Sequence, residues 1–208
     1  MSECGLALVR EQAPWADVAL YDERTCAMAA KHGQLSRLQM AHENGYPWDR
    51  LTCMLAAAGG QVECLQYAHE NGCAWDKHTC LSAAKNGNLD CLRYAHENDC
   101  DWDELTCSFA AMNGQLTCLQ YAHMHGCPWD KRTCLSAAEH GHLICLQYAH
   151  KNGCPLDKTT CAWAAVNNHL ACVQYAHENG CEWHEEGQSF AYKYDLMIHR
   201  KYACTPSA

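Results

Sequence analysis

The pattern of apolar and polar positions repeats every 27 residues, without a gap, from residue 25 to residue 186. Each unit begins with Thr-Cys, continues with an Ala pair, and reaches a Gly or Asn eight positions after the Thr. Its second half reads Leu-x-Cys-Leu-x-Tyr-Ala-His-Glu-Asn, as at residues 89–98. The pattern predicts six copies of one structural unit. They are expected at residues 25–51, 52–78, 79–105, 106–132, 133–159 and 160–186.

Each unit is predicted to hold two short antiparallel helices. An Asp stands three positions before each Thr and is well placed to cap the N-terminus of the first helix. These aspartates are Asp22, Asp49, Asp76, Asp103, Asp130 and Asp157. The residue before each Asp, such as Trp75, is then placed to form a hydrophobic staple with the Cys at the fourth helical position. The alternative is that the Thr, such as Thr79, is the cap. Gly or Asn is expected to close the helices, because both tolerate the left-handed backbone of a helix end.

A unit of this length has no core of its own, so its apolar faces must be covered by the units on either side. The sequence therefore predicts an all-α fold, an α-solenoid of stacked helix-turn-helix repeats, over residues 22–184. Residues 1–21 are expected to form an irregular N-terminal cap, because Pro14 would interrupt a helix in the repeat register. Residues 185–208 are expected to form a capping helix and tail, since Phe190 and Tyr194 begin an apolar stripe at helical spacing.

The segment Ala-Ala-x-x-Gly-x-Leu-x-Cys-Leu-x-Tyr-Ala-His-Glu-Asn-Gly resembles the core of the ankyrin repeat, and the resemblance covers all six units. The ankyrin period is longer by about six residues, which in that family form a projecting β-hairpin finger. The Thr-Pro-Leu-His tetrapeptide of the family is also missing here. The resemblance implies ankyrin-like helix pairs with short loops instead of β-hairpin fingers, and a role in protein–protein interaction. The short, cysteine-rich units are similar to ankyrin-like repeats of giant viruses and protists.

Composition narrows the classes of partner. The chain has 208 residues and a formal net charge of −9, which argues against nucleic-acid binding because that function needs a clustered basic face. No apolar run approaches the roughly 20 residues that span a bilayer. The N-terminal segment lacks a basic start followed by a long apolar core, so we expect no signal peptide. We therefore expect a cytoplasmic or nuclear monomer in a reducing compartment, with a protein partner and no membrane.

Sixteen of the eighteen cysteines fall in three columns that begin at Cys26, Cys64 and Cys73. Members of one column lie one repeat apart, about 8–10 Å, which is too far for a disulfide. We interpret them as small buried hydrophobic residues that stay reduced. The alternative is a metal- or redox-responsive protein. His69 and Cys73 are four residues apart, and this pair recurs in the later units. One pair supplies only two of the four ligands that a structural zinc site needs. We therefore predict no metal site and no cofactor.

A histidine stands in the last turn of every second helix. These residues are His42, His69, His96, His123, His150 and His177. A structural role is favoured, because an imidazole there can bond the terminal carbonyl groups and complement the negative helix end. Protonation near pH 6 would loosen the stack if these side chains are partly buried. No phosphate-binding loop, dinucleotide glycine motif or metalloprotease motif occurs, and Cys and His recur identically in every unit. We therefore expect no catalytic residues and no enzyme activity.

The candidate partner-binding residues are those that vary between units while the scaffold stays fixed. On the first helix they form a stripe opposite the Cys-Ala-Ala face, and units two, four and six place apolar side chains there. Large exposed apolar patches mark interfaces, and aromatic residues make good anchors. The predicted binding residues are Met28, Leu51, Leu55, Leu105, Phe109, Met112, Trp163 and Val166. The alternative is that these side chains pack against the neighbouring unit.

Overall fold

The structure is a computed structural model that describes residues 24–181, and all regular structure in that range is helical. Each unit contributes a first and a second helix. The first helices are α2 (Thr25–Lys31), α4 (Arg50–Gly59), α6 (Lys77–Asn86), α8 (Glu104–Met112), α10 (Lys131–Glu139) and α12 (Lys158–Val166). The second helices are α3 (Leu35–Glu43), α5 (Val62–Glu70), α7 (Leu89–Glu97), α9 (Leu116–Met124), α11 (Leu143–Lys151) and α13 (Leu170–Glu178). The predicted all-α solenoid is confirmed for these residues.

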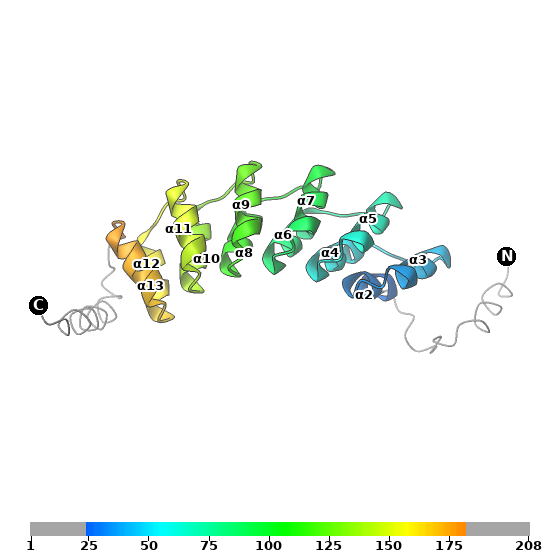
Figure 1. Cartoon of the computed structure of the whole chain (residues 1–208), viewed down its shortest axis with the longest axis horizontal. Coiled ribbons are helices and arrows are strands. Elements are labelled where there is room, and N and C mark those ends of the chain that lie inside the picture. The colour runs from blue at the N-terminus through cyan, green and yellow to red at the C-terminus, as the bar shows by residue number, and fades with distance from the viewer. Residues whose placement is uncertain (1–23, 182–208) are drawn as a thin grey trace, which may run out of the picture.

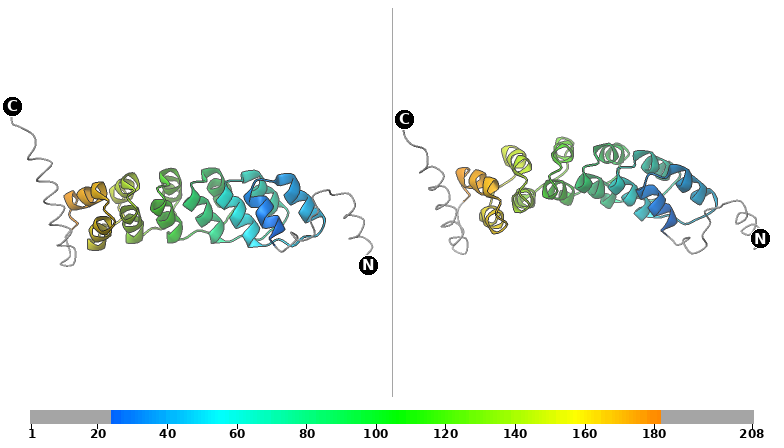
Figure 2. Two further views of the ribbon diagram at one scale, coloured as in Figure 1. Left: turned by 90° about the horizontal axis from the view of Figure 1, so that it is seen from below. Right: turned by 60° about the horizontal axis from the view of Figure 1, so that its bottom comes forward.

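The helix pairs stack side by side into a curved array with two rows (Figure 1). Neighbouring first helices pack closely, whereas neighbouring second helices touch much less. The closely packed row therefore lies on the inside of the curve, and α4, α6 and α8 lie below α5, α7 and α9 in Figure 1. Figure 2 shows the two rows as separate layers. The described loops between units contain no strand, as expected from their length.

The capping prediction is confirmed wherever the structure describes it. The Asp49 carboxylate accepts a hydrogen bond of 2.9 Å from the backbone N–H of Leu51. Asp76, Asp103, Asp130 and Asp157 make the same bond in their units. The alternative cap is wrong in units two to six, because each Thr there lies inside the helix and is buried. Asp22 lies outside the described residues, so the prediction is not tested in unit one.

The helix ends follow the predicted left-handed backbone. Asn168 and Asp99 stand where the other units have Gly, and they adopt φ angles of 63° and 62°. Gly59 has a different constraint, because a Cβ there would lie 2.2 Å from the carbonyl oxygen of Lys31 in the previous unit. Small residues at this point let the inner helices approach closely.

The core consists of repeated small residues. Cys53, Ala56 and Ala57 of α4 are fully buried, as are Leu65 and Ala68 of α5. All cysteines from Cys26 to Cys181 are buried and free. Each unit therefore contributes one stripe from each helix to a continuous core, as a solenoid requires. Within residues 24–181, no helix is long and apolar enough to cross a membrane.

The two predicted end caps lie outside the described residues. This applies to the irregular cap at 1–21, with Pro14, and to the capping helix at 185–208, with Phe190 and Tyr194. Both remain predictions.

Candidate partner-binding face

The inner face exposes apolar side chains in an uneven pattern. Met28 is 43% exposed, Trp163 46% and Val166 52%. The other predicted binding residues are half-buried between neighbouring first helices. They are Leu51, Leu55, Leu105, Phe109 and Met112. The stripe is therefore accessible at both ends of the array and partly covered in the middle.

Polar residues of the odd units interrupt this stripe. Lys85 is exposed, and its ammonium nitrogen lies 5.7 Å from the centre of the Phe109 ring in the next unit. Ser136, which lies on the same stripe in unit five, is buried, and its hydroxyl bonds the Ser108 hydroxyl at 3.1 Å. Its position shows that contacts between first helices cover part of the stripe near α8 and α10.

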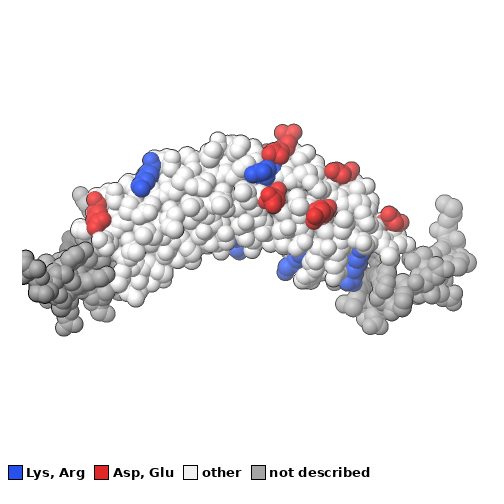
Figure 3. All heavy atoms as spheres, in the orientation of Figure 1, with Lys and Arg blue, Asp and Glu red and all other residues white. Residues whose placement is uncertain are grey.

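Charge differs between the two rows of helices. The basic residues of the first helices are Lys31, Arg50, Lys77, Lys85, Lys131, Arg132 and Lys158, against Glu104 and Glu139. The acidic residues of the second helices are Glu43, Glu63, Glu70, Asp90, Glu97 and Glu178, against Arg37, Arg93 and Lys151. Figure 3 shows the acidic groups along the outer surface, with some basic groups among them, and further basic groups at the inner edge. The inner face is thus the more basic of the two.

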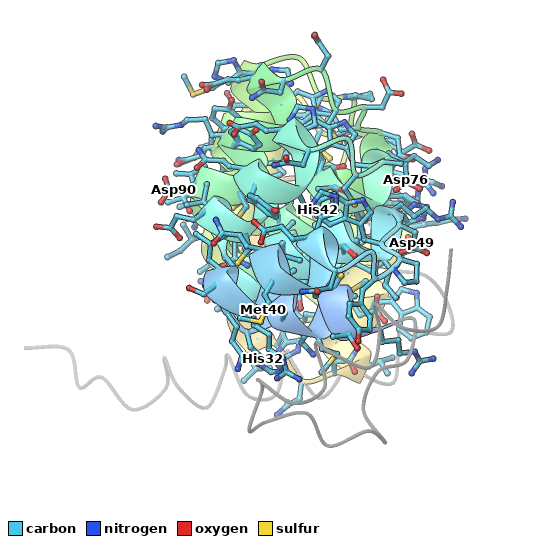
Figure 4. The ribbon with its side chains drawn as sticks, turned by 90° about the vertical axis from the view of Figure 1, so that its right-hand side faces the viewer. His32, Met40, His42, Asp49, Asp76 and Asp90 are labelled. Atoms are coloured by element: carbon cyan, nitrogen blue, oxygen red, sulfur yellow. The ribbon has the colours of Figure 1, made fainter. Side chains whose placement is uncertain are left out.

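A ladder of ion pairs joins the N-termini of successive first helices. The first residue of one helix pairs with the capping Asp of the next unit, as in Lys77 with Asp103 at 2.9 Å. Arg50 with Asp76 and Lys131 with Asp157 repeat this contact at 3.2 Å. Figure 4 shows Asp49 and Asp76 on one side of the stack and Asp90 on the opposite side. The ladder sets the register of the units along one edge.

Unit four departs from this ladder and is compensated. Glu104 occupies the position that is basic in units two, three, five and six, so it cannot pair with Asp130. Instead Arg132 of the next unit bonds both Glu104 and Asp130, each at 2.9 Å. The reversed charge at Glu104 is therefore compensated by Arg132 in the next unit.

A shallow pocket of about 330 Å³ opens at this edge between units two and three. Leu51 and Met54 line its apolar part, and Asp49, Arg50, Asp76 and His78 line its polar part. Of the predicted binding residues, Leu51 is the one that reaches this pocket.

The histidines of the second helices join neighbouring units. The sequence analysis did not predict this contact. His69 stacks on Trp75 with ring centres 3.7 Å apart, and its Nδ1 shares a hydrogen bond of 3.0 Å with the Tyr94 hydroxyl of the next unit. The stacking recurs at His42, His96 and His123, and the hydrogen bond at His42, His123 and His150. The expected bond to terminal carbonyls is therefore replaced by a side-chain clamp. A Trp six residues after a His was the signal available in the sequence.

The clamp differs at His96. No hydrogen bond joins His96 to Tyr121, and the buried Tyr121 hydroxyl has no partner. His125 stands where the other units have Asn, and its ring packs 4.3 Å from that of Tyr121. Burial, and then the nearby His125, hold the pKa of His96 below its ordinary value. The unpartnered Tyr121 hydroxyl and the histidine that replaces Asn at position 125 thus lie in the same unit.

The structure separates the histidines from the cysteines that follow them. His69 faces Trp75 and Tyr94, whereas the Cys73 thiol donates to the carbonyl of Asp49 at 3.1 Å. Among residues 24–181, no group of three or more His, Cys, Asp and Glu side chains is arranged to hold a metal ion. The two side chains of the His/Cys pair therefore face different neighbours.

Comparison with known proteins supports the assignment of the repeat. A family model described as ankyrin repeats (many copies) matches residues 80–123. The crystal structure of the human ASB11 ankyrin repeat domain is similar with a TM-score of 0.65 and 16% sequence identity, covering 76% of this chain and 84% of that chain. Comparison with curated proteins gave no match. The fold is generally a scaffold for protein–protein interaction. Residues 80–123 thus match ankyrin repeats in sequence, and the array has the fold of an ankyrin repeat domain.

Proposed function

We propose that this chain binds a protein partner along the inner face of the array, through the variable stripe of the first helices. One observation carries the proposal: Met28, Trp163 and Val166 are large apolar side chains exposed on a face that the fold leaves open. Exposed apolar groups on a repeat array lower the free energy of binding when a partner covers them. The half-buried members, Leu51, Leu55, Leu105, Phe109 and Met112, would extend the contact between these two ends.

The charges suggest which kind of partner fits. Lys31 and Lys85 are exposed on either side of Leu55, in the units before and after it. A partner segment with apolar anchors and acidic residues between them would complement this face, and the acidic outer row would repel it. We therefore propose an acidic, amphipathic segment of a protein as the ligand, bound by a monomer of this chain.

The test compares two double variants in a pull-down. Phe109→Asp with Trp163→Asp places two charges on the inner face, whereas Met124→Asp with Ile144→Asp places them on the outer row. Met124 and Ile144 are 77% and 64% exposed, so they are a demanding control for non-specific apolar binding. Circular dichroism checks that both variants keep their helices. We expect the inner pair to lose partners that the outer pair retains. Equal recovery with both variants would remove the proposed site.

A further inference from the structure

The capping aspartates use their two carboxylate oxygens for different contacts. In Asp76, the Oδ1 atom accepts the capping bond from the backbone N–H of His78 at 2.9 Å, and the Oδ2 atom binds Arg50 of the previous unit at 3.2 Å. The later units repeat this division, because Oδ1 again accepts the capping bond and Oδ2 again binds a basic side chain. Those aspartates are Asp103, Asp130 and Asp157.

Asp49 makes the cap without the cation. Its Oδ1 atom accepts from the backbone N–H of Leu51 at 2.9 Å, but no Lys, Arg or His within residues 24–181 forms an ion pair with this carboxylate. In the ladder, the cation usually follows the capping Asp of the previous unit, and in unit one that position is Glu23. Glu23 lies outside the described residues, but an acidic residue cannot supply the missing positive charge. The ladder is therefore incomplete at Asp49.

The unpaired carboxylate borders the pocket of about 330 Å³ between units two and three. Its lining residues are Asp49, Arg50, Leu51, Met54, Asp76 and His78. Leu51 and Met54 are half-buried and form its apolar wall, and Asp49 and Asp76 lie on one side of the stack (Figure 4). Two aspartates against one arginine give the lining a net charge of −1 when His78 is neutral. The pocket thus combines an apolar wall with excess negative charge.

A long basic side chain complements both parts of this pocket. Lysine and arginine have an aliphatic stem that packs on apolar surface and a charged head that stays in contact with water. The stem would lie on Leu51 and Met54, and the head would meet the Oδ2 atom of Asp49. An acidic side chain fits less well, because two carboxylates face it and Arg50 is already paired with Asp76 at 3.2 Å.

Neighbouring units show that either kind of basic side chain fits at this position. The equivalent Oδ2 atom holds Arg50 in unit three and Lys77, at 2.9 Å, in unit four. We propose that the pocket binds a lysine or arginine side chain of the protein partner, with its charge against the Asp49 carboxylate. The proposal rests on the proposed partner binding along the inner face, and it names one contact within that interface.

The pocket also orients the partner segment across the array. Asp49 stands at the start of α4, whereas Lys31 and Lys85 lie in the last turns of α2 and α6 on either side of it. α4 has 10 residues and is therefore about 15 Å long. An extended segment rises about 3.3 Å per residue, so it crosses this distance in about four to five residues. The partner should thus carry a basic residue about four or five positions away from its acidic residues.

The test is a titration of the full-length chain with the synthetic peptide acetyl-Arg-Leu-Ser-Leu-Glu-Glu-amide. A second peptide has Gln in place of Arg and is otherwise identical. Binding is followed by NMR of isotope-labelled methyl groups of Leu51 and Met54. We expect the Arg peptide to shift these signals and to bind about two- to fivefold more tightly than the Gln peptide, which is the range for an ion pair at a protein surface.

Three variants separate the charge from the cap. Asp49→Asn removes the charge and keeps a capping residue, since Asn caps about as well as Asp, and it should abolish the preference for the Arg peptide. Asp103→Asn is the matched control, because Lys77 already occupies its Oδ2 atom, and it should keep the preference. Glu23→Lys places a cation at the missing position of the ladder, so it should abolish the preference while Asp49 stays intact. Circular dichroism checks that each variant stays helical.

Equal binding of the two peptides to the wild-type chain, or a preference for the Arg peptide that survives Asp49→Asn, would overturn the proposal. The absence of any shift at Leu51 and Met54 would do the same. This failure is distinct from failure of the proposed function, which the Phe109→Asp and Trp163→Asp double variant tests with the pocket intact. If that variant loses its partners while Asp49→Asn binds both peptides as the wild type does, the inner face remains the site and the pocket is not part of it.

Discussion

Because the Tyr121 hydroxyl has no partner, replacing Tyr by Phe should affect the free energy of unfolding differently at two equivalent positions, 94 and 121. Tyr94 and Tyr121 occupy the same position in neighbouring units, but only the Tyr94 hydroxyl has a histidine partner, His69 at 3.0 Å. Tyr94→Phe removes that hydrogen bond and should destabilise the array by about 0.5–1.5 kcal/mol. Tyr121→Phe removes a buried polar group that makes no bond, so it should be neutral or stabilise by up to about 1 kcal/mol.

The substitution at position 125 adds a second arm to this prediction. Asn occupies this position in the other units, where its amide donates to the carbonyl four residues earlier, as Asn98 does to Tyr94 at 2.8 Å. His125→Asn should free Tyr121 to bond His96, as its counterparts do. In that background Tyr121→Phe should become destabilising by about 1 kcal/mol, which a double-mutant cycle measures as coupling.

Urea unfolding followed by circular dichroism measures these differences, with hydrogen exchange of the α9 amides as a local readout. The local readout is needed because long repeat arrays can unfold in parts. A difference of about 1 kcal/mol should shift the melting midpoint of a chain of this size by about 2–4 °C. Equal losses for Tyr94→Phe and Tyr121→Phe would refute the assignment of the hydroxyl contacts.

Three further outcomes are expected from the core, the caps and the histidines. Leu92→Ala should cost about 2–5 kcal/mol in urea unfolding, because Leu92 is fully buried between units. Asp76→Ala should cost about 1 kcal/mol through the lost cap, whereas Asp101→Ala, at an exposed loop position, should change the midpoint little. The melting midpoint should fall as the pH drops below about 6.5, because burial holds the pKa of His96 and of His142 below the ordinary value. The unfolded chain then binds more protons than the folded chain, so acid favours unfolding; a midpoint that is equal at pH 7 and pH 5 would contradict this.

The fold was predictable because its signals are local and repeated. Asp49 is three residues from Thr52, and the cap, the helix start and the buried Thr all follow from that spacing. The left-handed backbone at Asn168 was also predictable, because it depends on the type of one residue at a helix end. Caps and helix-ending residues, which depend on one helix end, could therefore be predicted from the sequence.

Contacts between elements were harder to predict. The sequence shows that Trp75 follows His69, but stacking depends on how the loop folds back over the helix end. Comparing column-mates considers contacts along one column, so it overlooked the contact of the Cys53 thiol with the Cys73 carbonyl, which joins two columns. Ser136 lies on the stripe opposite the Cys-Ala-Ala face but is buried, because a neighbouring first helix covers it and the pattern of one helix does not show that contact. The binding stripe is subject to the same effect, so its role stays a prediction.

The account depends on the partner lying against the inner row of helices, and site-specific photo-crosslinking tests this most directly. A photoreactive residue is placed at position 109 or 163 on the inner face, and at position 124 or 144 on the outer row. The account predicts that crosslinks to the same partner form from the two inner positions and not from the two outer ones, although the outer side chains are the more exposed. Crosslinks from the outer positions alone, or from all four equally, would contradict it.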